Sequence, residues 1–400
     1  MRALLKFEIK KIIMKKSTIV TFLILFGIQV LLGISGSLGN TYVNDVFVET
    51  HAQRNRIDRA HGNAMSGRVI DEALLAEVRE NYGGFDWSTE GYQWMKEYNQ
   101  QVRKYEDLAM RIRRWGRGTG YSFDNMTEEV LYELREQGRE SMWSSYKLSE
   151  EEKAYWTAKE AEVEKPFVYE YALGYEMITD MQGIYMTCML ITFFIAISMV
   201  TVFAEEHTRK TDQLILCTRF GKGKAYFAKI LAGSLVVFGI NLLFVVVLVV
   251  GRFYSFGTEG FEAAIQLVTE WYSYPLSMGW VLIIMIGLLL LSSVMVAIFS
   301  MLLAEVLRNS IPAMAVVVGL LFAARLVPIP PSFKILSMVW NYFPINMLKI
   351  DTGFTDLRLI NLFGVQLTGW QFAPILYVIL IVAMICVGRV IYKNYQVSGR

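Results

Sequence analysis

Long uncharged segments are the feature that most constrains how this chain can fold. Residues 17–38 form a run of 22 residues without a charged side chain. As an α-helix this run would be about 33 Å long, enough to cross a hydrocarbon core of roughly 30 Å. Five further apolar segments lie at 184–204, 230–251, 276–303, 311–327 and 372–388. With a hydrophobic content of 54%, they predict an all-α integral membrane protein with six transmembrane helices.

Basic residues indicate the orientation. The segments that share a side with the N-terminus are 2–16, 205–229, 304–310 and 389–400, and they hold 16 Lys and Arg against 5 Asp and Glu. Under the positive-inside rule this side is cytoplasmic, so we expect a multi-pass protein of the cell membrane with both termini inside. Residues 1–16 predict a helix at the inner interface, and 389–400 a cytoplasmic tail.

One alternative concerns the first span. It could be the core of a cleaved signal peptide, with Ser35 and Ser37 as the small residues near the cleavage site. Its apolar run is longer than such cores usually are, which favours a permanent span.

A charged region separates the first two spans. Residues 39–180 hold 18 Lys and Arg against 27 Asp and Glu. Aromatic and aliphatic side chains recur at three- and four-residue steps from about 89 to 115, and Thr127 and the Ser149-x-x-Glu152 capping box open two further helical patterns. We therefore expect a mainly helical extracellular domain here.

Two other features lie on the same predicted side. The domain is rich in Tyr and Trp, which indicates either a small aromatic core or an acidic, aromatic surface for a cationic or amphipathic peptide. The sequence leaves both interpretations open. Residues 328–371 are aromatic and weakly charged, which is typical of helices that lie at the outer interface or re-enter it.

The charged segment 205–229 lies between the second and third spans. Leu214, Ile215 and Leu216 lie among acidic residues at 205, 206 and 212 and basic residues at 209, 210, 219, 222, 224 and 229. Such a pattern predicts a short amphipathic helix on the cytoplasmic surface. A helix in this position could contact a soluble partner and be displaced by its movement.

These residues resemble the ABC-2 type permease family. The resemblance rests on Glu205 at the end of a span, the leucine-rich turn 211–216, the small and basic turn 218–224 and Lys229 at the start of the next span. The chain departs from the pattern at Phe220-Gly221, where many relatives have proline.

The resemblance implies a set of coupling residues. Glu205 and Glu206 would be an acidic hinge; Asp212, Leu214, Ile215 and Leu216 would form the coupling helix; Arg219, Lys222 and Lys224 would hold it against lipid phosphate or a partner. For any single lysine, the alternative is an ordinary charge at the membrane interface.

The resemblance also implies partners. It implies two copies of an ABC ATPase chain, which bind and hydrolyse ATP, and a second permease subunit that makes a homodimer or a heterodimer. Membrane lipids surround the assembly, and a net charge of +2 with dispersed basic residues gives no argument for nucleic acid.

The chain itself lacks the motifs of an enzyme. No G-x-x-x-x-G-K-[ST] motif occurs, and residues 221–224 have the right residue types at the wrong spacing. Glu205-Glu206 followed by Lys210 resembles the E-E-x-x-x-R motif of glutamate-dependent intramembrane proteases, but no other span supplies the histidine that they need. We expect no catalytic residues, no cofactor and no metal in this chain.

The predicted function is that of the permease subunit of an ABC transporter, which exports a peptide, an antibiotic or another amphipathic compound. Ionisable residues are scarce inside the spans, which argues against an ion-coupled carrier. Arg325 is the exception, and we expect it to extend to the outer interface. The alternative is a membrane receptor or scaffold that senses an extracellular ligand without transport.

Overall fold

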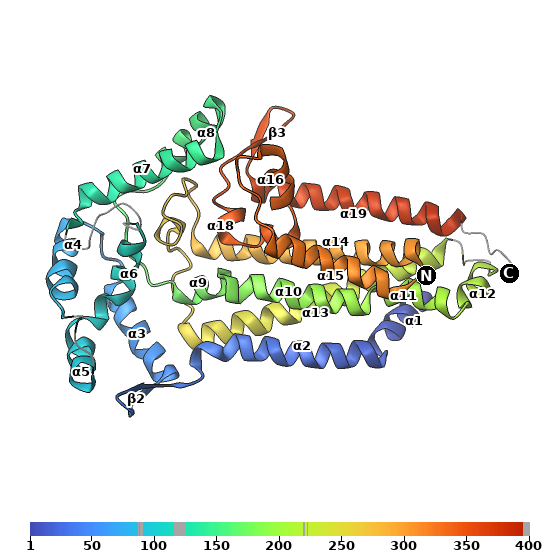
Figure 1. The fold of residues 1–400 in the computed structure, drawn as a ribbon, viewed down its shortest axis with the longest axis horizontal. Helices are drawn as coiled ribbons and strands as arrows, with labels where there is room; N and C mark the ends of the chain where they lie inside the picture. Colours follow the sequence, from blue (N-terminus) through green and yellow to red (C-terminus); the bar gives the residue numbers. More distant parts are fainter. Residues whose placement is uncertain (87, 89–90, 116–124, 219–220, 222, 395–400) are drawn as a thin grey trace.

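An elongated helical bundle carries a second group of helices at one end (Figure 1). The computed structural model describes residues 1–400 except 87, 89–90, 116–124, 219–220, 222 and 395–400. Met1 and the last turn of α19 lie at the opposite end of the bundle. We call these the domain end and the terminal end.

Five helices in the described part of the chain are long and apolar enough to cross a membrane. They are built from α2 (Lys16–Ile34), α10 (Met186–Ser198) with α11 (Thr201–Thr208), α13 (Lys224–Phe256), α14 (Met278–Leu307) and α19 (Gly369–Asn394). The sixth predicted span, 311–327, falls on α15 (Ser310–Leu326), an apolar helix of 17 residues. The chain is therefore a mostly helical membrane protein.

The helix α13 is longer than the apolar segment that predicted it. It begins before Lys229 and continues through Arg252 to Phe256. Both charged side chains are buried, Lys229 against Glu206 and Arg252 beside the carbonyl of Gln182 at 3.4 Å. A charged residue usually ends a transmembrane helix where it would face lipid. Lys229 and Arg252 contact protein groups instead, so α13 continues beyond both of them.

Polar and small residues join α2, α10 and α13 towards the domain end of the bundle. The amide of buried Gln29 on α2 donates to Thr187 Oγ1 on α10 at 2.9 Å and to the Phe244 carbonyl on α13 at 3.1 Å. Gly33 and Gly251 let α2 and α13 approach closely, since a Cβ on Gly251 would lie 2.8 Å from the Gly33 Cα. These are interhelix contacts of the kind common in membrane bundles.

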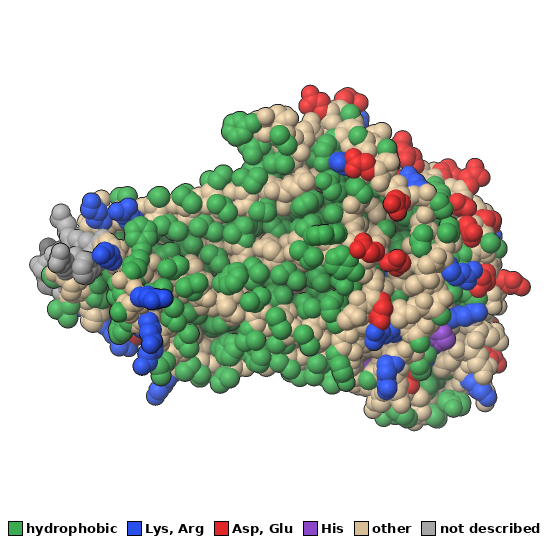
Figure 2. Space-filling model, turned by 180° about the vertical axis from the view of Figure 1, so that it is seen from behind, with side chains coloured by type: hydrophobic (Ala, Val, Ile, Leu, Met, Phe, Trp, Pro, Cys, Tyr) green, Lys and Arg blue, Asp and Glu red, His purple; other side chains and the backbone are tan. Residues whose placement is uncertain are grey.

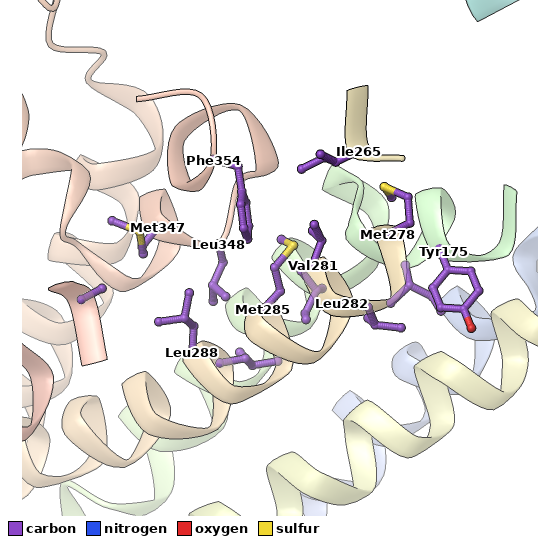
Figure 3. Close-up of a cluster of buried hydrophobic side chains, with 14 of the residues drawn as sticks. Tyr175, Ile265, Met278, Val281, Leu282, Met285, Leu288, Met347, Leu348 and Phe354 are labelled. Atoms are coloured by element: carbon purple, nitrogen blue, oxygen red, sulfur yellow. The ribbon is translucent and has the colours of Figure 1, made fainter. Parts of the chain in front are cut away.

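The helix α14 is the centre of the bundle, and α10, α13, α15 and α19 all pack against it. Towards the domain end its side chains Met278, Val281, Met285 and Leu288 point into a buried cluster that also holds side chains from 344–354 and from the loop before α14 (Figure 3). The core of the bundle thus continues into the segments that join the helices.

The domain end begins with a hairpin. Strands β1 (Asn40–Val43) and β2 (Val46–Thr50) pair antiparallel, and Asn44 and Asp45 make the turn with positive φ. Helices follow: α3 (His51–Met65), α4 (Glu72–Val78), α5 (Tyr92–Gln101), α6 (Glu106–Trp115), α7 (Glu128–Tyr146), α8 (Glu150–Ala161) and α9 (Leu173–Thr179). The capping box predicted at Ser149 opens α8, and Thr127 caps α7.

The prediction of one continuous helix from 89 to 115 is wrong. The described part of this range forms α5 and α6, with a 3-10 turn at Arg103–Tyr105 between them. Arg103 is buried there and binds Asp58 at 2.7 Å and Glu49 at 3.0 Å. A buried arginine needs such partners, and reaching them from this position breaks the helix.

The aromatic residues of the domain divide between core and surface. Trp115, Tyr105 and Tyr169 are buried in one cluster, and Trp156 lies in the cluster that continues into the bundle. Trp94 stacks on Tyr98 in a half-buried position instead. Most of these rings therefore serve the core.

The segment between α15 and α19 forms short elements at the domain end. They are α16 (Lys334–Asn341), α17 (Pro344–Met347), α18 (Ile350–Gly353) and a hairpin of β3 (Ile360–Leu362) and β4 (Val365–Leu367). The indole of Trp156 on α8 donates to the Leu357 carbonyl at 2.6 Å, which ties this segment to the helical domain.

Arginines also tie the domain to the loop between α13 and α14. Arg111 donates to the Leu267 carbonyl at 3.3 Å, Arg114 to the Val268 carbonyl at 3.0 Å and Arg135 to the Tyr272 carbonyl at 2.9 Å. We call these three residues the arginine clamp. Because charged donors satisfy buried carbonyls, the clamp fixes the loop to the domain.

Candidate functional site

A short helix at the terminal end projects between two long helices. This helix, α12 (Thr211–Leu216), lies between α11 and α13 (Figure 1). The side chain of Leu214 is 74% exposed, and that of Ile215 is half-buried. An exposed leucine on a helix that joins two candidate spans is a surface suited to a partner.

Backbone turns fix both ends of α12. Before it, Lys210 has a φ of 57°, which ends α11 in the left-handed region. After it, the amide of Gly221 donates to the Thr218 carbonyl at 3.1 Å. A Cβ at Gly221 would collide with the Ile215 carbonyl oxygen, so this position requires glycine.

A buried ion pair lies at the base of α12. Glu206, near the end of α11, binds the ammonium of Lys229 on α13 and also that of Lys11 on α1 (Arg2–Ile13). Lys229 is 0% exposed, and its Nζ lies 5.1 Å from the ring of Phe203 and 5.7 Å from that of Tyr392. One carboxylate and two aromatic faces thus surround the buried ammonium.

Two further contacts surround this pair. Glu205 is half-buried and accepts from Lys15 at 2.6 Å, and it also binds Arg209. On the other side, His207 Nε2 lies 2.9 Å from a carboxylate oxygen of Glu305 on α14. Side chains from α1, α11, α13 and α14 therefore meet in one place, which we call the inner ion cluster.

The pKa of Lys11, which lies on α1 outside the spans, reflects the charges of this cluster. Burial alone would lower the pKa of Lys11, but the carboxylates of Glu206 and Glu8 raise it above its ordinary value. Lys11 thus stays charged at neutral pH. The helix α1 is consequently held against the bundle, with Glu8 and Ile12 buried, rather than only lying on a lipid surface.

The structure separates the two predicted hinge acids. Glu206 lies at the centre of the inner ion cluster and Glu205 at its rim, while Lys224 begins α13 with an exposed side chain. Leu214 and Ile215 are on α12 as predicted. The predicted residues Arg219 and Lys222 lie outside the described residues, as do the side chains of Asp212 and Leu216.

Sequence reasoning missed several members of the cluster. Lys229 was expected to be one of the basic residues at the membrane surface, which is wrong because it is fully buried. The partner residues Lys11, Lys15 and Glu305 were not singled out. A signal existed in two places: Lys229 follows five residues after the start of α13, within an otherwise apolar stretch, and Glu305 is the one acidic residue of α14.

The inner ion cluster lies beside the connection between α11 and α13. The α12 segment is joined directly to α11 and α13, and the Glu206–Lys229 pair locks these two helices together just above it. Removing one member of a buried ion pair is costly, so this contact holds α11 and α13 together.

The comparison with known protein families gives one result that covers most of the chain. The family model described as ABC-2 family transporter protein matches residues 2–346. This range includes α1, the helical domain, the inner ion cluster and α12. No curated protein and no solved structure matches the chain.

Proposed function

The chain belongs to the ABC-2 family of transporter proteins, and from this membership we propose that a separate ABC ATPase chain docks on α12 and drives it. The family makes this chain the membrane subunit of an ABC transporter. Two ATPase copies and a second permease subunit, identical or different, would complete the assembly.

The single observation that carries the proposal is the position of Leu214. Among the side chains described on the segment between α11 and α13, it is a highly exposed leucine, and the inner ion cluster joins those helices beside it. An apolar anchor surrounded by polar residues is the usual centre of a protein interface. Movement of the ATPases on ATP binding would push α12 and tilt the two helices together.

The charge distribution supports a cytoplasmic location for α12. Lys and Arg side chains gather at the terminal end of the molecule, beyond the apolar band, while Asp and Glu gather at the domain end (Figure 2). This asymmetry agrees with the positive-inside rule. The helical domain would then lie outside the cell, and residues 328–371 would lie at the outer surface of the cell membrane.

The cargo that we propose is an amphipathic compound such as a peptide or an antibiotic, moved outward. The charges that are buried in the inner ion cluster pair with one another and lie at the terminal end of the bundle, next to α12. The apolar character of the remaining spans suits a cargo with a large hydrophobic surface.

The test measures association and ATP turnover together. An ABC ATPase encoded beside this gene is purified with the chain in lipid nanodiscs, as wild type and as Leu214→Asp. We expect the aspartate to abolish co-purification and the turnover that depends on the chain, because it places a charge at the apolar anchor.

Two variants control for general damage. Leu214→Met keeps an apolar side chain and should retain binding. Met14→Asp places the same charge on another exposed apolar residue at the terminal end and should also retain it. Undiminished co-purification of Leu214→Asp would remove the coupling assignment, and absence of any associated ATPase would favour a receptor or scaffold instead.

A further inference from the structure

An apolar groove runs along the outside of α14, between α15 and α19. Its volume is about 840 Å³, within the range of about 300–1,000 Å³ that ligand pockets occupy. Representative lining residues are Val296, Leu302, Leu321, Met338, Leu376 and Met384. The groove belongs neither to α12 nor to the inner ion cluster.

The lining offers almost nothing to a polar ligand. Thr192 is among the few hydroxyl-bearing residues of the wall, and its hydroxyl already donates to the Cys188 carbonyl at 2.8 Å. An apolar cavity of this kind does not hold ordered water. Because α15 and α19 both expose apolar side chains beside it, a hydrocarbon chain from the membrane is the natural occupant.

The length of the groove matches one leaflet. Along α19 its wall extends from Phe372 to Met384, which is about 18 Å at the helical rise of about 1.5 Å per residue. The hydrocarbon core of a bilayer is roughly 30 Å thick, so each leaflet supplies about half of that. The groove is therefore about as long as the acyl chain of a lipid in one leaflet.

At the end nearest the helical domain, apolar side chains of α16 cover the groove, and basic residues lie beside them. The helix α16 exposes Ile335 and Val339, which line the groove, and Lys334 next to them. Arg325, one residue after the groove residue Ala324, is also exposed. Apolar side chains beside basic ones are typical of a helix that lies among lipid headgroups.

The acidic groups near this rim leave the positive charge largely available. Asp356 is bound by Arg358 at 2.6 Å and by Asn341 at 2.8 Å. Glu152 lies 4.0 Å from the Lys334 ammonium, at the limit of an ion pair. The guanidinium of Arg325 lies 5.7 Å from the ring of Tyr185 and remains exposed.

We propose that this groove binds an acyl chain of an anionic membrane lipid, with the phosphate of its headgroup at Lys334 and Arg325. The proposal requires that the chain lies in a membrane, but it does not require transport or an ATPase. It makes the groove a lipid site on one subunit, roofed by α16.

The test maps where a lipid chain contacts the protein. The full chain is placed in nanodiscs with phosphatidylglycerol that carries a diazirine in its acyl chain, irradiated and analysed by peptide mass spectrometry. We expect labels concentrated on groove-wall residues such as Met338 and Met384. Leu321→Trp, which fills the groove, should reduce these labels several-fold.

Matched variants separate the groove from general lipid contact. Val316→Trp adds the same ring to a side chain of α15 that is not part of the groove wall and should leave the labels unchanged. Val317→Phe is a smaller filling for use if Leu321→Trp does not fold. Labels spread evenly over the exposed faces of α2, α15 and α19, and insensitive to filling, would overturn the site.

A separate experiment tests the assignment of the headgroup. A phosphatidylcholine probe with the same diazirine chain should label the groove several-fold less than phosphatidylglycerol does. Replacing both cations, Arg325→Gln with Lys334→Gln, should remove that preference, while Lys147→Gln on the domain surface should not. Equal labelling of the wild type by both probes would overturn the anionic headgroup.

Discussion

The two ends of the molecule use buried basic residues in different ways. At the domain end, the arginine clamp donates to main-chain carbonyls of the loop before α14. At the terminal end, Lys11 and Lys229 meet on one carboxylate, Glu206, and α12 extends beyond them with Leu214 exposed. The difference teaches that the domain is fastened to the bundle over a broad area, whereas α12 is held at its two ends.

This comparison suggests a division of labour. The core cluster around α14 includes Trp156 and Tyr175 from the helical domain, so the domain and the bundle share one core. The inner ion cluster joins α1, α11 and α13 at one point, and under the proposed function a push on α12 would reach all three. Four changes, ordered by the size of their expected effect, break or sharpen the contrast.

The largest effect is expected at the inner ion cluster. Glu206→Gln leaves the Lys229 ammonium buried without a carboxylate, which should lower the free energy of unfolding by about 3–5 kcal/mol. Thermal unfolding in detergent, followed by tryptophan fluorescence, measures the change. The double variant Glu206→Leu with Lys229→Met should recover most of the loss, because it removes both charges.

The neighbouring acid is the control. Glu205 is partly exposed, so solvent screens its ion pairs, and Glu205→Gln should cost less than about 1 kcal/mol. Equal small shifts for the two variants would mean that the buried pair does not join the helices.

A smaller effect is expected at the arginine clamp. Arg135→Met leaves the Glu270 and Tyr272 carbonyls without their donor, at a cost of about 1–3 kcal/mol for an unsatisfied buried group, while Glu160 loses Arg135 but keeps Arg139 and Lys165 as partners. Hydrogen exchange should increase first in the loop before α14. Lys153→Met removes an exposed ion pair on α8 and should not change that exchange. Faster exchange throughout the bundle, with none specific to this loop, would argue against a local clamp.

Acid should weaken the domain end through Glu160. Burial alone would raise the pKa of Glu160, but hydrogen bonds and charge from Arg135 and Lys165 lower it from 4.5 to about 2. The native state therefore favours the ionised form, so this contribution is present above pH 4.5 and is lost as the pH falls from 4.5 to 2. Unfolding midpoints measured across that range should fall less steeply in Glu160→Gln. Identical slopes for wild type and variant would contradict the assignment.

The smallest effect on stability is expected on α12. Leu214 is exposed, so Leu214→Asp should change the free energy of unfolding by no more than about 0.5 kcal/mol. The same thermal assay checks this value. A large destabilisation would mean that Leu214 packs within the chain, and the contrast between the two ends would fail.

The sequence predicted the features that depend on local pattern. The apolar run at 17–38 matches α2 with its following turn, and the capping box at Ser149 opens α8, because hydrophobicity and capping act over a few residues. The site was predicted only in part. Leu214 and Ile215 were placed on a short helix, but nothing in the pattern paired Glu206 with Lys11, 195 residues away.

The remaining features depend on contacts across the fold. The break between α5 and α6 comes from Arg103, which binds Glu49 and Asp58 on earlier elements. The clamp residue Arg135 reaches a loop about 135 residues further along the chain. Charged residues in an amphipathic pattern are assigned to solvent by periodicity alone, so these buried roles could not be read from it.

The most direct test of the account is a photocrosslink from α12 to the ATPase. Benzoylphenylalanine replaces Leu214 in the full chain, which is irradiated in membranes together with the ATPase encoded beside it. We expect a crosslink to the ATPase from position 214 and none from position 254, where Tyr254 is 79% exposed towards the domain end. A probe at 214 that reaches lipid alone, or an ATPase crosslink from 254, would contradict it.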